Sequence, residues 1–103
     1  MSDTQKDEEF IQMADAFIAL ANKYTQSVDK GKVSAAFLYA AARFNTYVVA
    51  ASAPDAGEFA SYQENALAYF KAEYHKMLVE HFADYQQNFA AYLKEKTDGK
   101  HIN

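Results

Sequence analysis

The chain has 103 residues and a formal net charge of −4 at pH 7, and half of its residues are hydrophobic, which is typical of a globular protein. The acidic balance argues against a general affinity for nucleic acid or for an anionic membrane surface, and the absence of cysteine excludes disulfides, thiolate catalysis and cysteine-based zinc sites. Three glycines and one proline are too few for the turns of a β-sandwich or barrel, so the composition indicates helices.

The first predicted helix covers about residues 4–29. Thr4 and Asp7 approximate a capping box at its start, and the acidic residues that follow suit the positive end of the helix dipole. Gly31 is expected to end the helix in the left-handed conformation. The apolar residues recur every three or four positions and trace a single face, formed by Phe10, Met13, Ala14, Phe17, Ile18, Ala21, Tyr24 and Val28.

The second predicted helix, about residues 32–53, is apolar on two sides. The strong face is formed by Val33, Phe37, Ala40, Ala41, Phe44, Val48 and Ala51, and the weaker face by Ala35, Leu38, Ala42 and Val49. One of the narrow polar seams between the faces carries Tyr39, Arg43 and Thr46. A helix that is apolar nearly all round is normally buried, and no helix of a three-helix monomer is surrounded. The weaker face is therefore predicted to contact a fourth helix or, preferably, a second subunit.

Residues 33–53 are long enough to span a bilayer, but Arg43 lies at their centre. A central arginine opposes membrane insertion, and the alanines around it contribute little apolar surface in compensation. The first nine residues are acidic where a secretory signal would be basic and then apolar. The sequence therefore predicts no transmembrane helix, no export signal and a cytoplasmic location.

The third predicted helix covers about residues 57–96, with Pro54 ending the helix before it and Asp55 as its N-cap. The 38 residues from Phe59 to Lys96 contain no glycine or proline, and an uninterrupted helix over them would measure roughly 57 Å, which exceeds the ~26 Å diameter of a compact domain of this size. Its apolar stripe rotates by roughly 120° after Leu78. We therefore expect the helix to bend or break near His81, or to serve two partners along its length. The stripe after the rotation is a predicted interface, formed by Phe82, Tyr85, Phe89, Tyr92 and Leu93.

Residues 59–71 and 82–94 share a pattern of identical residues at an offset of 23 positions. The shared residues of the first copy are Phe59, Ala60, Tyr62, Gln63, Asn65, Ala68, Tyr69 and Lys71. Because this offset is not a whole number of helical turns, the copies would face different directions on one helix. The pattern is explained equally well by a true repeat and by chance in a segment rich in alanine, tyrosine and phenylalanine.

No motif for catalysis or metal binding is visible. The three histidines lack the Glu-x-x-His pairing of a di-metal bundle site, and there is no glycine-rich phosphate loop or nucleophile motif. The lysines are scattered, and the eight tyrosines and eight phenylalanines are spaced as core or interface residues rather than as a nucleic-acid surface. The sequence therefore predicts no catalytic residue, metal, cofactor or nucleic-acid partner.

Arg43 is the single arginine of the chain, and its planar guanidinium suits bidentate binding of a carboxylate or phosphate. The favoured interpretation is an ion pair, within the chain or between subunits, for which Asp15 and Glu73 are candidates. The alternative is a ligand-binding site in which Arg43, together with Tyr39 and Asp15, holds an anionic group.

Several segments of the chain resemble a known family. These are residues 14–22 and 31–45, together with Tyr69-Phe70 and residues 74–78. They resemble an uncharacterised proteobacterial family of small helical proteins, domain of unknown function 3144, over roughly residues 10–85. The resemblance implies a bacterial, cytoplasmic helical protein and assigns no catalytic or binding residue.

Together these patterns predict a single all-α domain over residues 1–103. Its expected architecture is an up-and-down bundle of three main helices with a mobile tail at residues 97–103. The predicted function is a non-enzymatic interaction module, a homodimer that also binds an unknown protein partner. The alternative hypothesis is a small-molecule carrier with an aromatic pocket between helices, in which Arg43 holds the anionic group of the ligand.

Overall fold

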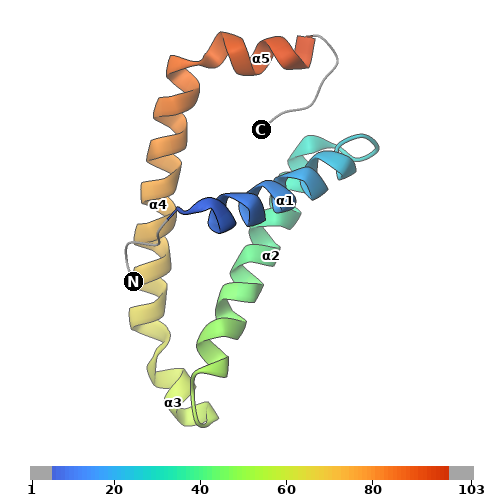
Figure 1. Ribbon diagram of the computed structural model, residues 1–103. Helices are drawn as coiled ribbons and strands as arrows, with labels where there is room; N and C mark the ends of the chain where they lie inside the picture. Colours follow the sequence, from blue (N-terminus) through green and yellow to red (C-terminus); the bar gives the residue numbers. More distant parts are fainter. Residues whose placement is uncertain (1–5, 98–103) are drawn as a thin grey trace.

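A computed structural model describes residues 6–97 of the chain, with side chains as far as residue 93 (Figure 1). The described residues form five helices and no strand, so the predicted all-α class is confirmed. The helices are α1 (Glu8–Tyr24), α2 (Lys30–Ala51), α3 (Ala56–Ser61), α4 (Gln63–Gln87) and α5 (Phe89–Thr97). Thr4 and most of the predicted mobile tail lie outside the described residues.

The start of α1 is fixed by Asp7, whose carboxylate accepts a hydrogen bond from the backbone N–H of Phe10 at 2.9 Å. Two glutamates in the first turn add negative charge at the positive end of the helix dipole. The helix ends at Tyr24, earlier than expected, and the hydroxyl of Thr25 donates to the carbonyl of Asn22 at 2.8 Å. This side-chain hydrogen bond competes with continued helix, so a turn follows.

Gly31 does not end α1, so that prediction is wrong. It lies in the first turn of α2, whose N-cap is Asp29, and the Asp29 carboxylate accepts from the backbone N–H of Lys32 at 3.2 Å. A Cβ atom on Gly31 would lie 3.0 Å from the Asp29 carboxylate. The glycine thus leaves room for the capping side chain, which is a different use from the left-handed turn that we expected.

The segment expected as one long helix is divided into α3, α4 and α5. Asp55 caps α3 by accepting from the backbone N–H of Glu58 at 2.9 Å, as predicted. The chain then breaks at Tyr62 and again at Asn88. The predicted break near His81 is wrong, because α4 continues without interruption through that residue.

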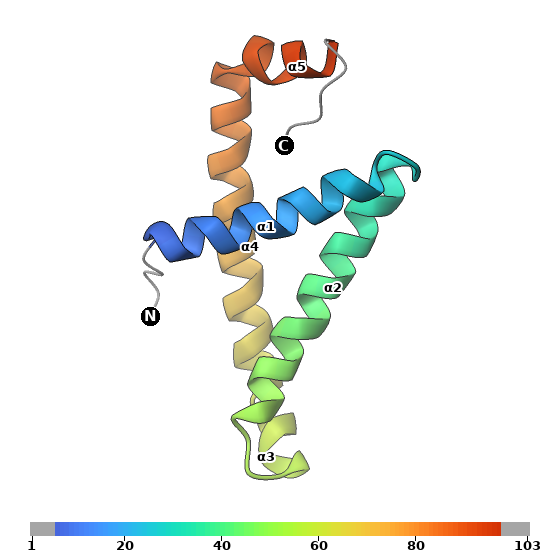
Figure 2. The same cartoon turned by 45° about the vertical axis from the view of Figure 1, so that its right-hand side comes forward.

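The helices enclose an open triangle (Figure 2). From α3, α2 and α4 diverge as two arms, and α1 returns from the far end of α2 to cross α4, where Lys6 and Glu80 form an ion pair at 3.2 Å. The main helix–helix contacts all join consecutive helices. The radius of gyration is 16.6 Å, against about 13 Å for a compact domain of this length. The predicted bundle packing is therefore not confirmed in the single chain.

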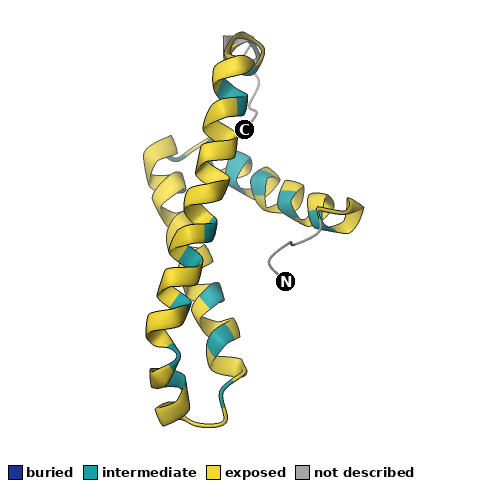
Figure 3. Cartoon of the chain, turned by 90° about the vertical axis from the view of Figure 1, so that its left-hand side faces the viewer, coloured by how far each residue is buried: buried dark blue, intermediate teal, exposed yellow. Residues whose placement is uncertain are grey.

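None of the side chains described in residues 6–93 is buried, and the most enclosed of them are half-buried (Figure 3). On α1 the half-buried positions include Phe10, Ala14, Ile18 and Ala21, which belong to the predicted apolar face. None of the helices in the described part of the chain is long and apolar enough to cross a membrane.

Candidate functional site

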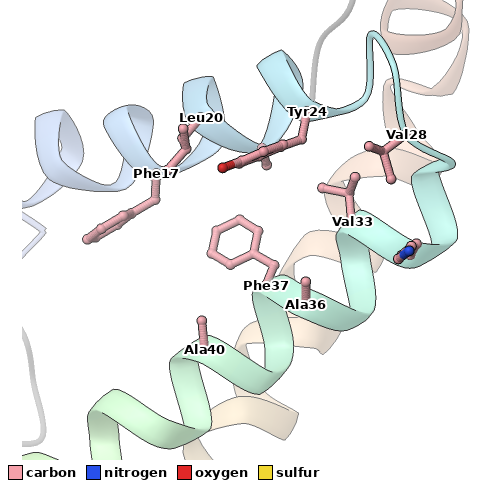
Figure 4. Close-up of a pocket in the computed structure, with 10 residues that line it drawn as sticks. Phe17, Leu20, Tyr24, Val28, Val33, Ala36, Phe37 and Ala40 are labelled. Carbon is pink, nitrogen blue, oxygen red and sulfur yellow. The ribbon is translucent and has the colours of Figure 1, made fainter.

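An apolar groove lies between α1 and α2, close to the turn that joins them (Figure 4). Its volume is about 580 Å³, within the range of small-molecule clefts. The lining residues are Phe17, Leu20, Ala21, Tyr24, Val28, Lys32, Val33, Ala36, Phe37 and Ala40. Lys32 is the only charged residue among them, so the groove suits an apolar occupant.

The groove follows from the helical spacing of its lining residues. On α1, Phe17, Leu20 and Tyr24 recur at intervals of three and four and therefore share one face. On α2, Ala36 and Ala40 leave space on either side of Phe37, whose ring points into the gap between the helices (Figure 4). The apolar faces that the sequence predicts for both helices thus form the walls, yet their large side chains stay too exposed to make a core.

The predicted ligand-binding residues are placed elsewhere. Asp15, Tyr39 and Arg43 are all exposed, and none of them lines the groove. Within the described residues Arg43 forms no ion pair, while Glu73, one of its expected partners, pairs with Lys76 at 3.3 Å. Among residues 6–93 Arg43 therefore has no ion-pair partner within its own chain, and a pair between subunits stays a prediction.

A second organised feature is the corner between α4 and α5, which we call the Asp84 corner and define by Asp84, Tyr85, Asn88 and Tyr92. The Asp84 carboxylate accepts from the side-chain amide of Asn88 at 2.8 Å and from the Tyr92 hydroxyl at 2.7 Å. The Asn88 amide also donates to the Asp84 carbonyl at 3.1 Å. The rings of Tyr85 and Tyr92 stack with centroids 3.9 Å apart. These contacts fix the direction in which α5 leaves α4.

The corner also explains why the repeat does not produce the same structure twice. Asn65, the counterpart of Asn88, lies inside α4, and Ser61 occupies the position that corresponds to Asp84. Instead of an acceptor for two side chains, Ser61 offers a hydroxyl, which donates to the Glu58 carbonyl at 2.6 Å. Asp84 is therefore one of the positions at which the copies differ, and the sequence pattern does not point to it because it is not among the shared residues.

We expect Asn88→Ala to straighten the corner into continuous helix. Alanine is a better helix former than asparagine, and the substitution removes both side-chain hydrogen bonds to Asp84. A straight helix would separate residues 79 and 97 by about 27 Å, and the corner holds them closer. Spin labels at Val79→Cys and Thr97→Cys should report this increase, and an unchanged distance would show that Asn88 does not set the corner.

The corner should open at alkaline pH. The hydrogen bond to Asp84 raises the pKa of Tyr92, and burial, with the nearby Asp84 charge, raises the pKa of Tyr85. A raised pKa contributes stability that is complete below the ordinary tyrosine value of about 10 and is lost as the pH rises through the raised value. In a ¹³C-tyrosine NMR titration both signals should move later than that of free tyrosine, and Asp84→Asn should advance both. Titration of both at the free value would contradict the contact.

The predicted interface residues fall into two groups. Tyr85 and Tyr92 are half-buried because they stack on one another, and Val49 is also half-buried. The others are exposed, namely Leu38, Ala42, Phe82, Phe89 and Leu93. The exposed members lie on α2, α4 and α5, so they do not form one patch along a single helix.

The part of the chain that the structure describes contains no group of three or more histidine, aspartate and glutamate side chains placed to hold a metal ion. His75 and His81 lie on α4. His101 lies outside the described residues.

Comparison with known proteins gives one finding. The family model described as "Protein of unknown function (DUF3144)" matches residues 10–86, from the first turn of α1 to the last turn of α4. No curated protein and no solved structure matches the chain. The match includes the groove and excludes α5.

Proposed function

The chain belongs to the DUF3144 family, and we propose that it is a homo-oligomeric, non-enzymatic interaction module, in its simplest form a homodimer. The observation that carries the proposal is the absence of any buried side chain in residues 6–93 of a chain that is half hydrophobic. Burial of apolar surface is the dominant favourable contribution to folding and has to offset a large loss of conformational entropy. A chain of this composition gains that contribution when a partner covers its apolar faces.

The predicted interface residues support the same proposal. Leu38 and Ala42 on the weaker face of α2 are exposed, and Phe82 and Phe89 are more than half exposed. An ion pair of Arg43 with an acidic side chain of a second subunit would fit the exposure of Arg43. A bacterial source, a cytoplasmic location and a further protein partner belong to this proposal as expectations from the sequence.

Native mass spectrometry of the untagged protein tests the proposal. We expect a dimer without a bound ligand, and sedimentation velocity should give the same mass in solution. A monomer at micromolar concentration would overturn the proposal, because the apolar faces would then be stable without a second subunit.

One observation favours a second candidate function, a carrier of a small apolar molecule. The α1–α2 groove has a volume of about 580 Å³ and is apolar apart from Lys32. In this version Lys32, and not Arg43, lies where it could meet an anionic group of the ligand. The same mass spectrum distinguishes the candidates, since a carrier would appear as a monomer with a fixed additional mass.

A further inference from the structure

The geometry points to a specific way in which two copies assemble: α5 of one copy docks in the α1–α2 groove of the other, and the exchange is reciprocal. This inference rests on the proposed homo-oligomer and adds to it the two surfaces that meet. It depends on the area left uncovered, on the match between α5 and the groove, and on the fixed Asp84 corner.

The uncovered area is too large for a small ligand. The chain exposes 8650 Å². A compact monomer of the same mass would expose about 5,800 Å², so the excess is about 2,800 Å². A standard protein interface covers about 800 Å² on each partner, and obligate dimers cover more. The excess is therefore of the size that an obligate dimer buries.

The groove and α5 fit one another in length and chemistry. The groove walls run for about two helical turns on each side, from Phe17 to Tyr24 and from Val33 to Ala40, which is roughly 10 Å. The nine residues of α5 extend for about 13 Å. Phe89 and Leu93 are one turn apart on α5, so they share a face that can enter the groove as apolar anchors.

The Asp84 corner prevents α5 from filling the groove of its own chain. Its hydrogen bonds and the stacked tyrosines hold α5 at the end of α4 that is far from α3, so that α5 lies above α1 in both views (Figures 1 and 2). The main helix contacts of α5 are with α4. While the corner is intact, only the α5 of another molecule can reach the groove. Each copy carries both α5 and the groove, so two copies related by a two-fold axis can each place α5 in the groove of the other. Such a dimer leaves neither surface open to a third copy.

The absence of natural cysteine permits a direct test by disulfide trapping. Ala90 lies beside the Phe89–Leu93 face of α5, and Ala91 lies on the opposite face, so Ala91→Cys is the matched control. Each of these variants is co-expressed with Ala36→Cys or Ala40→Cys, which place a thiol in the groove wall. The two chains carry different tags, so that a mixed disulfide is recognised by its mass.

We expect mixed disulfides from Ala90→Cys with at least one groove variant, and at least tenfold less from Ala91→Cys. Equal trapping of both would overturn the inference, as would a dimer in native mass spectrometry that gives no mixed disulfide. That last result would leave the proposed homo-oligomer intact. A chain carrying both Ala36→Cys and Ala90→Cys that forms only an internal disulfide would show that α5 closes its own groove, which also overturns the exchange.

Discussion

Replacing Phe89 with alanine should raise the dissociation constant of the homodimer about a thousandfold. An aromatic anchor at the centre of an interface contributes about 2 kcal/mol, and a two-fold dimer contains two copies, so the loss is about 4 kcal/mol. Phe89 is 59% exposed in the single chain, and alanine favours helix, so the substitution should cost the isolated chain little. Sedimentation equilibrium over a range of concentrations measures the dissociation constant.

Tyr74→Ala is the matched control for this experiment. Tyr74 is 45% exposed and lies on α4, outside the groove and outside the predicted interface residues. We expect its dissociation constant to stay within about threefold of the unmodified protein. Equal weakening by both substitutions would mean that any exposed aromatic supports association. A dimer unaffected by Phe89→Ala would remove α5 from the interface. Circular dichroism should show that both variants remain helical above their dissociation constants.

The helical class and the Asp55 cap followed directly from local signals. Asp55 is a good N-cap directly after Pro54, and the structure uses it. At the first helix the sequence suggested Thr4 with Asp7 as its capping-box partner, whereas in the structure Asp7 is itself the N-cap. Between α1 and α2 the signals compete, because Asp29 can start a helix where Gly31 can end one. The sequence does not rank these alternatives, since the outcome depends on whether the Asp29 carboxylate has room to reach a backbone N–H.

The Asp84 corner was beyond prediction for a different reason. At the end of α4, Asp84, one turn before Asn88, accepts from the Asn88 side chain, and Tyr92 returns to the same carboxylate. Each of these residues also occurs within helices, so none of them alone indicates a break. The rotation of the apolar stripe after Leu78 predicted the break near His81 instead. The corner depends on the contacts among its four residues together, and no single one of them predicts it.

The groove was half predicted. The apolar faces of α1 and α2 were identified from their spacing, and they form its walls. The residues predicted to bind a ligand, Arg43 with Asp15 and Tyr39, lie outside these faces. Periodicity shows that a helix face needs a partner, but it does not say whether the partner belongs to the same chain. This is also why a closed bundle was expected where the single chain forms an open triangle.

The thermal stability of the protein should depend on its concentration. If two folded chains unfold together, a tenfold increase in concentration stabilises the dimer by about 1.4 kcal/mol. The entropy of unfolding is about 2.1 cal/mol/K per residue, which for two chains of 103 residues gives about 0.43 kcal/mol/K. The melting temperature should therefore rise by about 3 °C for each tenfold increase, measured by circular dichroism at 222 nm between 1 and 100 µM.

The Phe89→Ala variant provides the control, because at low concentration it should be largely dissociated. Its helices then lose the apolar contacts of the partner, and since no described side chain is buried within one chain, its transition should be broad and lie well below that of the unmodified dimer. A sharp transition of the unmodified protein at the same temperature from 1 to 100 µM would contradict the argument. Such a result would mean that one chain covers its own apolar faces, which requires the triangle to close.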